Sequence, residues 1–214
     1  MSARVRTAVL ISGRGSNMVS LLQAAADPAF PAEIVLVVAN RADAGGIARA
    51  QAAGVETRVI PHKDFPNDRA AHEAALDAVL VATGVELVCL AGYMRILTPL
   101  LVGRWAGRML NIHPSLLPAF PGLHTHARAI AAGVKLAGCT VHWVTEGMDE
   151  GPAIAQAAVP VLPGDTEDTL AARVLAQEHV IFPLALRLAA TLQTGEGDAA
   201  AALVNPLPPP AAGH

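Results

Sequence analysis

Short apolar runs, each followed by a helix-like segment, recur through the first half of the chain and constrain its fold more than any other feature. The first two runs show no polar alternation, which is typical of parallel strands that are covered on both faces. The expected strands are Thr7–Ser12, Ile34–Ala39, Thr57–Ile60, Leu87–Ala91 and Met109–His113.

Helical segments separate these strands, and each is closed by a glycine or an Asp-Pro pair. We expect helices over Met18–Ala26, Gly46–Ala53 and Asp68–Ala82. Strands that alternate with helices imply right-handed crossovers. The pattern therefore predicts an α/β, Rossmann-like fold with a mostly parallel sheet, helices on both faces and ligands at the carboxyl ends of the strands.

The second half of the sequence changes character after the fifth strand. Ala137–Thr145 and Ala153–Pro160 are expected to be strands, and the polar loop between them is too short for a parallel crossover. The two segments therefore predict an antiparallel extension of the sheet.

A long helix is expected over Thr166–Ala190, with Thr166 or the aspartate before it as the N-cap. Pro183 is expected to kink or interrupt this helix. A chain of 214 residues is long enough for one such domain and short for two. We expect one domain over residues 1–190 and a mobile Pro/Ala-rich tail over residues 191–214.

Composition excludes several classes of partner. Lys and Arg number 15 against 18 Asp and Glu, so the chain lacks the basic excess of a nucleic-acid-binding protein. No apolar run reaches the roughly 20 residues of a membrane-spanning helix, and the run Val9–Ile11 is too short for a signal peptide, so we expect a cytoplasmic protein without a membrane partner. Cys89 and Cys139 lack metal-site spacing and are expected to be reduced core residues.

The segment Gly13-Arg14-Gly15-Ser16-Asn17 follows the first strand and precedes the first helix. Glycines allow close approach of the backbone to an anion, and a helix N-terminus offers free N–H groups, so the segment fits a phosphate. A nicotinamide cofactor is disfavoured because Met18 occupies the third glycine position of the dinucleotide fingerprint. A plain glycine turn with Ser16 or Asn17 as N-cap is the alternative.

Asn111 and His113 stand at the end of the fifth strand, two residues apart and on the same side. An amide donor and an imidazole so placed can both reach one oxygen as it gains charge. A carboxylate such as Asp149 near His113 would favour the imidazolium and could collect a proton. The alternatives are a structural histidine and an ordinary acidic residue of a surface loop.

Four motifs in order make the chain resemble the glycinamide ribonucleotide formyltransferase family, folate-dependent enzymes of purine synthesis. The resemblance runs from about Val9 to about Leu186. The motifs are Leu10–Asn17, Leu90–Leu97, Asn111–Pro118 with Pro121–His126, and Gln177–His179.

The resemblance implies a formyltransferase fold, 10-formyltetrahydrofolate as co-substrate, and the amine of glycinamide ribonucleotide as acceptor, with no metal and no nicotinamide. It implies catalysis by Asn111, His113 and Asp149, with His142 in a supporting role; a strand histidine that merely packs is the alternative for His142. The implied ligand contacts are Gly15, Ser16, Asn17 and Glu178 for the acceptor and Arg69, Met94, Arg95, Ile96, Leu97 and Asn111 for the folate.

Two residues depart from the family pattern. Arg14 stands where many members carry a small amide or similar residue, and Glu150 replaces a glycine that often follows the catalytic aspartate. The first adds a positive charge near the phosphate or points to solvent, and the second bears on the backbone shape of the loop.

Other functions share part of this pattern. Methionyl-tRNA formyltransferases usually add a basic C-terminal domain, and formyltetrahydrofolate hydrolases carry an N-terminal regulatory domain, so neither is the expected function. A non-catalytic folate- or nucleotide-binding protein would not need Asn111, His113 and Asp149 together. Small-molecule substrates are expected, in a monomer or a homodimer.

Overall fold

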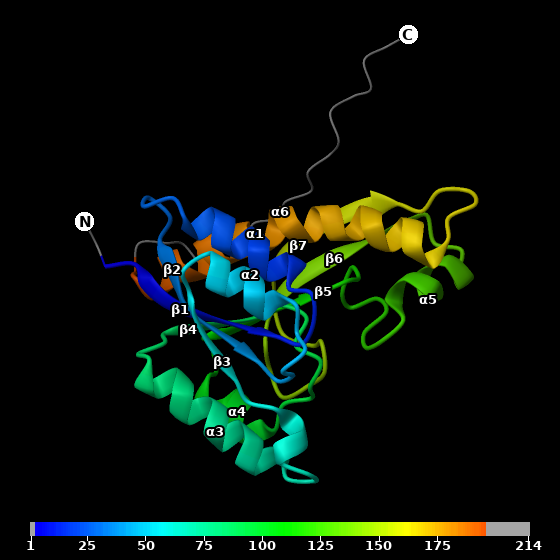
Figure 1. Ribbon diagram of the computed structural model, residues 1–214. Helices are drawn as coiled ribbons and strands as arrows, with labels where there is room; N and C mark the ends of the chain where they lie inside the picture. The colour runs from blue at the N-terminus through cyan, green and yellow to red at the C-terminus, as the bar shows by residue number, and fades with distance from the viewer. Residues whose placement is uncertain (1–2, 196–214) are drawn as a thin grey trace.

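The computed structural model describes residues 3–195 and contains one seven-stranded sheet in the order β3-β2-β1-β4-β5-β6-β7 (Figure 1). The strands are β1 (Val5–Ile11), β2 (Ala32–Ala39), β3 (Glu56–Val59), β4 (Leu87–Leu90), β5 (Met109–His113), β6 (Leu136–Trp143) and β7 (Ala153–Pro160). All seven expected strands are present, with bounds that differ from the predicted ones by two residues or fewer.

The sheet is parallel from β3 to β5 and antiparallel beyond. The chain first builds outward from β1 through β2 to β3, and then returns to place β4 on the other side of β1. This reversal makes β1 and β4 the topological switch point, where the segments that follow two neighbouring strands diverge and leave room for a ligand. The fold predicted from the sequence, including the antiparallel extension, is confirmed.

Helices cover both faces of the sheet. Figure 1 shows α1 (Ser16–Ala25), α2 (Gly46–Ala52) and α6 (Glu167–Gln193) on one face, and α3 (Arg69–Ala82) and α4 (Pro99–Arg104) on the other.

The alternation of side chains along the strands supplies both cores. In β1, Val9 and Ile11 join the cluster under α1 and α6, whereas Ala8 and Leu10 join the cluster under α3 and α4. This double burial explains why β1 is continuously apolar from Ala8 to Ile11. Cys89 and Cys139 are both buried and unpaired, as expected.

Helix α6 corrects two expectations. It runs without interruption from Glu167 to Gln193, so Pro183 does not break it, and it includes residues 191–193, which were assigned to the tail. The buried side chains on both sides of the proline hold the helix against the sheet, and this packing outweighs the missing backbone donor. Thr166 is the N-cap, as expected. Thr194 is the C-cap of the helix, and residues 196–214 of the predicted tail lie outside the described residues.

Three short elements were not predicted: the 3-10 turn η1 (His62–Asp64), α4 and α5 (Thr125–Ala131). Each is too short to show a full amphipathic repeat in sequence. The start of α1 also differs from the expectation, because Gly15 is its N-cap and Ser16 and Asn17 belong to its first turn.

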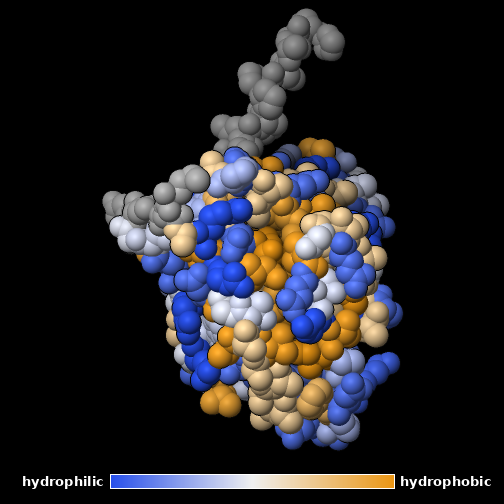
Figure 2. Space-filling model, turned by 60° about the vertical axis from the view of Figure 1, so that its left-hand side comes forward, coloured by the Kyte–Doolittle hydropathy of each residue, from blue (hydrophilic) through white to orange (hydrophobic). Residues whose placement is uncertain are grey.

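The surface carries polar and apolar side chains in mixture. Figure 2 shows hydrophobic patches separated by bands of hydrophilic side chains. Within residues 3–195, no helix combines the length and the apolarity that a bilayer crossing requires.

Candidate active site

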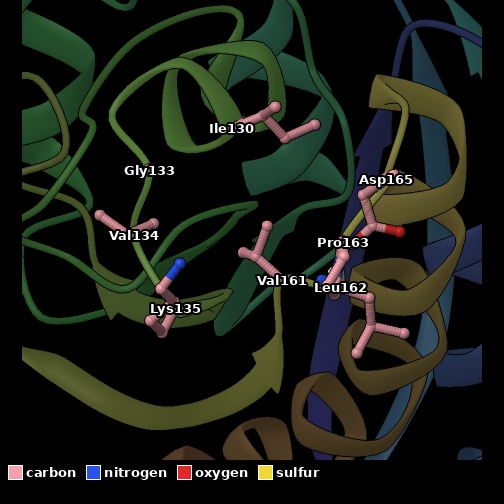
Figure 3. A pocket seen from close by; sticks show the side chains of 9 residues that line it. Ile130, Gly133, Val134, Lys135, Val161, Leu162, Pro163 and Asp165 are labelled. Atoms are coloured by element: carbon pink, nitrogen blue, oxygen red, sulfur yellow. Dashed lines mark hydrogen bonds between the residues drawn. The ribbon is translucent and has the colours of Figure 1, made fainter.

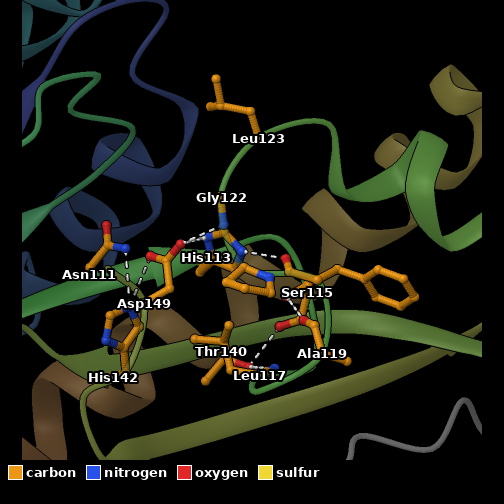
Figure 4. Close-up of polar contacts among 12 residues, drawn as sticks. Asn111, His113, Ser115, Leu117, Ala119, Gly122, Leu123, Thr140, His142 and Asp149 are labelled. Atoms are coloured by element: carbon orange, nitrogen blue, oxygen red, sulfur yellow. Dashed lines mark hydrogen bonds and ion pairs between the residues drawn. The ribbon is translucent and has the colours of Figure 1, made fainter. Parts of the chain in front are cut away.

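Asn111 and His113 lie at the carboxyl end of β5, which pairs in parallel with β4 on one side and antiparallel with β6 on the other. The register places His142 of β6 directly opposite Asn111. The Asn111 Nδ2 atom lies 3.2 Å from His142 Nε2 (Figure 4). The strand pairing therefore brings together two residues that the sequence analysis assigned to one site.

His142 is buried, with 3% of its surface exposed. Its Nδ1–H donates to the carbonyl oxygen of Trp143 at 2.9 Å. The burial lowers the pKa of His142, which favours the neutral ring. In that form Nε2 is an acceptor, and it receives an N–H of the Asn111 amide and thereby orients it. This contact gives His142 a polar partner in the site beyond strand packing.

His113 is the second buried imidazole, and its two nitrogens face different oxygens. Nε2–H donates to the carbonyl oxygen of Phe120 at 3.1 Å, and Nδ1 lies 3.4 Å from Oδ2 of Asp149. Only a doubly protonated ring has a donor for both oxygens. The geometry therefore suits an imidazolium beside a carboxylate, in a pair whose side chains are 7% and 12% exposed.

Asp149 lies where the loop after β6 turns back toward β7. Its backbone has φ 57°, a left-handed conformation that is uncommon for residues other than glycine. Oδ2 accepts the backbone N–H of Gly122 at 2.8 Å, and Oδ1 lies 3.8 Å from His142 Nε2. One carboxylate thus faces both histidines of the site (Figure 4). The neighbouring Glu150 folds its side chain over Gly147, where an added Cβ would come within 2.1 Å of the carboxylate oxygen.

A polar network fixes the loop between β5 and α5, and its members were missed in the sequence analysis. Ser115 Oγ donates to the carbonyl oxygen of Ala119 at 2.6 Å. Thr140 Oγ1 donates to the carbonyl oxygen of Ser115 at 2.7 Å and accepts the N–H of Leu117 at 3.0 Å. Gln156 donates to the carbonyl oxygen of Leu117 at 2.9 Å. Sequence spacing gives no signal for contacts between β6, β7 and a distant loop.

Arg128 of α5 holds the next part of the same loop. Its guanidinium donates to the carbonyl oxygen of Pro121 at 2.5 Å and lies 5.6 Å from the centroid of the Phe120 ring. The carbonyl oxygen of Phe120 accepts the Nε2–H of His113, and the backbone N–H of Gly122 donates to Oδ2 of Asp149. The loop therefore positions both members of the imidazole–carboxylate pair.

The glycine motif forms the turn between β1 and α1. Gly15 has φ 70°, and a Cβ there would lie 3.0 Å from Gly46 Cα, so both the conformation and the close approach of α2 require glycine. Helix α1 has no side-chain cap, which leaves its first N–H groups without a capping oxygen from Ser16 or Asn17. The alternative of Ser16 or Asn17 as N-cap is wrong. Arg14 is exposed.

Asn17 and Glu178 are both predicted to contact the acceptor substrate, and their side chains meet although they are far apart in sequence. Asn17 Nδ2 donates to Glu178 Oε2 at 2.6 Å, and the burial of Glu178 raises the pKa of its carboxyl. Asn17 Oδ1 is buried without a hydrogen-bond partner in the described structure. A buried orphan acceptor beside a carboxylate is suited to a ligand that brings N–H or O–H donors.

The predicted folate residues divide into two places. Met94 to Leu97 follow β4 at the switch point, next to the turn after β1, and Met94 and Ile96 are 66% and 61% exposed. Arg69 is exposed at the start of α3, and its side chain makes none of the side-chain hydrogen bonds found among residues 3–195. The structure therefore does not join Arg69 to the other folate residues through a direct contact.

A pocket of about 340 Å³ opens elsewhere on the surface (Figure 3). It contains none of the predicted site residues. Its lining residues are Ile130, Gly133, Val134, Lys135, Val161, Leu162, Pro163, Gly164 and Asp165. Within the described part of the chain, no group of three or more His, Cys, Asp or Glu side chains is arranged to hold a metal ion.

Comparison with known proteins connects this arrangement to one family. Residues 5–186 match the family model described as formyl transferase. Trifunctional purine biosynthetic protein adenosine-3 of Drosophila pseudoobscura pseudoobscura is 53% identical over 190 residues, which are 88% of this chain and 14% of that protein. The chain thus spans about a seventh of the length of that relative.

Similar proteins of comparable length also occur. Phosphoribosylglycinamide formyltransferase of Escherichia coli (strain K12) is 46% identical over 178 residues, covering 83% of this chain and 84% of that protein. The crystal structure of phosphoribosylglycinamide formyltransferase from Brucella melitensis matches with a TM-score of 0.83 and 56% identity, covering 94% of this chain and all of that one.

Proposed function

The chain belongs to the formyl transferase family, and we propose that it transfers the formyl group of 10-formyltetrahydrofolate to the primary amine of glycinamide ribonucleotide. The products are formylglycinamide ribonucleotide and tetrahydrofolate. The observation that carries the proposal is the meeting of Asn111, His113 and Asp149 at the carboxyl end of β5. A relative of similar length that is named for this reaction supports the choice of acceptor.

The proposed step is direct attack of the acceptor amine on the formyl carbon. A carbon–nitrogen bond forms, and the formyl oxygen becomes an oxyanion that an N–H of Asn111 and the charge of His113 stabilise. The separation of 3.4 Å between His113 Nδ1 and Asp149 Oδ2 is longer than a good charge-assisted hydrogen bond, so the Nδ1 proton stays within reach of a substrate oxygen.

Collapse of the intermediate breaks the bond between the formyl carbon and N10 of the folate. The attacking nitrogen loses one proton and N10 gains one, and Asp149 is the group proposed to relay it, directly or through water. Asp149 also keeps the His113 imidazolium paired. His142 acts through Asn111, because its Nε2 accepts one N–H of the amide and leaves the other free.

The two substrates approach from neighbouring loops in this proposal. The backbone of Gly15, Ser16 and Asn17 at the start of α1 receives the acceptor phosphate, because N–H groups and the helix dipole favour an anion there. Glu178, beside Asn17, lies near the amine end of the acceptor. Arg69 and residues 94–97, with Asn111, contact the folate. The absence of a metal, a nicotinamide, a nucleic acid and a membrane partner, the cytoplasmic location and the choice between monomer and homodimer remain predictions.

A three-arm assay tests the proposal. The purified chain is mixed with 10-formyltetrahydrofolate alone, with glycinamide ribonucleotide added, and with the acceptor replaced by its dephosphorylated form, and the loss of formyl folate is followed by absorbance. We expect rapid loss only with the phosphorylated amine. Loss at the same rate without amine would identify a hydrolase, and tight folate binding without any loss would identify a non-catalytic binding protein.

A further inference from the structure

The 92–97 loop, which joins β4 to α4, carries most of the residues proposed to contact the folate. It contains no regular secondary structure, and its Met94 and Ile96 side chains are largely exposed. An irregular, exposed segment keeps one shape only when other elements hold its backbone. The position of this loop therefore depends on its anchors.

The first anchor lies at the start of the loop. The backbone N–H of Met94 donates to Ser12 Oγ at 2.8 Å. Ser12 directly follows β1, and β1 pairs with β4, so the switch-point topology brings the two segments together. This anchor connects the 92–97 loop to the turn proposed to hold the acceptor phosphate.

The second anchor lies just beyond the loop and comes from α3, on the face of the sheet that α3 and α4 cover. Glu73 of α3 receives two hydrogen bonds from Thr98: the backbone N–H donates to Oε1 at 2.8 Å, and the hydroxyl donates to Oε2. Thr98 is the N-cap residue of α4, but its hydroxyl does not cap the helix by a side-chain hydrogen bond. The hydroxyl binds Glu73 instead.

Glu73 is a costly residue at this position. Only 4% of its surface is exposed, and among residues 3–195 it forms no ion pair with a cation. A buried carboxylate is tolerated when hydrogen bonds replace its water. Both donors to this carboxylate found among residues 3–195 belong to Thr98, so the carboxylate and the end of the loop stabilise each other.

A residue one helical turn further along α3 provides a contrast. Asp77 accepts from Arg104 Nε at 2.8 Å and from Trp105 Nε1 at 2.9 Å, at the far end of α4. Both acidic residues thus connect α3 to α4. Only Glu73 does so where the 92–97 loop enters the helix.

We propose that Glu73 is a positioning residue for the folate site, which acts through Thr98 to hold the backbone of the 92–97 loop. The inference rests on the proposed function, because that function makes the loop a folate contact. Glu73 itself is buried behind the loop and touches neither substrate in this proposal. Its removal should weaken folate binding and leave acceptor binding intact.

The test compares three variants with the wild-type chain: Glu73→Ala, Glu73→Gln and, as a matched control at the same helix interface, Asp77→Ala. The KM of each substrate is measured together with Tm, and the Kd of tetrahydrofolate is measured by calorimetry as a readout that needs no turnover. We expect Glu73→Ala to raise the folate KM and Kd by about tenfold, the effect of losing hydrogen bonds to a charged group. The acceptor KM should change less than twofold.

The other two variants separate positioning from stability. Glu73→Gln keeps an acceptor for the Thr98 N–H and should restore most of the folate affinity. Asp77→Ala should lower Tm about as much as Glu73→Ala while leaving the folate constants unchanged. Unchanged folate constants in Glu73→Ala, or an equal rise in Asp77→Ala, would overturn the inference. A wild-type chain that binds tetrahydrofolate but transfers no formyl group would instead contradict the proposed function, and the Kd values would still decide the role of Glu73.

Discussion

At the scale of single residues, the site is built from side chains whose hydrogen-bonding roles are fixed by their neighbours. His142 donates its Nδ1–H to the carbonyl oxygen of Trp143, so its Nε2 is an acceptor for the Asn111 amide. His113 donates its Nε2–H to the carbonyl oxygen of Phe120, so its Nδ1 faces Asp149. The two imidazoles of the site are therefore suited to different tasks: His142 as a hydrogen-bond acceptor, and His113 as a ring whose two nitrogens both face oxygens.

His113→Ala tests the role of the charged imidazole. We expect kcat to fall by about 10² to 10⁴, the usual contribution of a general acid–base or electrostatic group, with little change in the Kd of the acceptor. Steady-state kinetics and calorimetry on the same preparation provide the two numbers. A variant with unchanged turnover would exclude His113 from the chemistry.

Residue spacing predicted part of this site. Asn111 and His113 could be placed from the end of an apolar run, since alternate residues of a strand share a face. Asp149 could be assigned only through the family resemblance, because the turn that aims it at His113 leaves no spacing signal. The supporting contacts of Ser115, Thr140 and Gln156 join segments up to 39 residues apart, and local sequence patterns do not encode them.

At the scale of elements, α1 and α6 meet through a polar contact inside an otherwise apolar interface. Asn17 donates to Glu178, whose pKa is raised by burial. A raised pKa means that the folded state disfavours the ionised carboxyl, so the penalty is absent at low pH and grows as the pH rises through the folded-state pKa. The proposed contact of Glu178 with the acceptor substrate explains why a buried carboxyl stands at the interface between α1 and α6.

Glu178→Gln should therefore make the protein more stable and less active. At about pH 8 we expect the free energy of unfolding to rise by about 1 kcal/mol and the acceptor KM to rise by about tenfold. Urea unfolding and steady-state kinetics measure the two effects. The exposed Glu167→Gln on the same helix is the control and should change neither quantity. A loss of stability in Glu178→Gln would refute the account of this contact.

Prediction of β1, β2 and β4 succeeded because these strands are buried on both faces, and their apolar runs reflect that burial directly. The helices α4 and α5 were missed because they span 6 and 7 residues, too few for a periodic face. Helix α2 is as short, and it was predicted only because a glycine closes its segment between two predicted strands. The interruption expected at Pro183 does not occur, because tertiary packing outweighs local helix propensity, and the sequence pattern alone does not show that packing.

At the scale of the whole molecule, several buried or half-buried histidines make stability depend on pH. Burial is the largest influence that lowers the pKa of four of them: His72, His126, His142 and His179. The unfolded chain takes up protons near pH 6.5, at a pH where these folded-state imidazoles remain neutral. Proton uptake by the unfolded state then lowers the free energy of unfolding as the pH falls.

We expect Tm to decrease between about pH 7.5 and about pH 5.5, and His72→Gln to reduce this decrease. His72 is a suitable probe because it is 2% exposed and lies outside the proposed catalytic group. Calorimetric scans of both proteins across this range give the slopes. Identical slopes in the variant and the wild type would show that the buried neutral state of His72 does not contribute.

The overall topology joins both proposed substrate loops at one edge of the sheet. The turn after β1 and the segment after β4 are neighbours because the strand order reverses between them, and β5 adds the proposed catalytic residues beside β4. A small acceptor and a folate bound to these loops would meet at Asn111, His113 and Asp149. We expect the formyl group to pass between the two substrates without release to water.

A carbon-13 label in the formyl group of 10-formyltetrahydrofolate follows that transfer directly. The labelled donor is incubated with the chain and glycinamide ribonucleotide, and the fate of the carbon is measured by nuclear magnetic resonance. We expect the label to appear in the formyl amide of the acceptor, at a rate that falls sharply in His113→Ala. Label recovered as formate, in the presence of the amine, would contradict it.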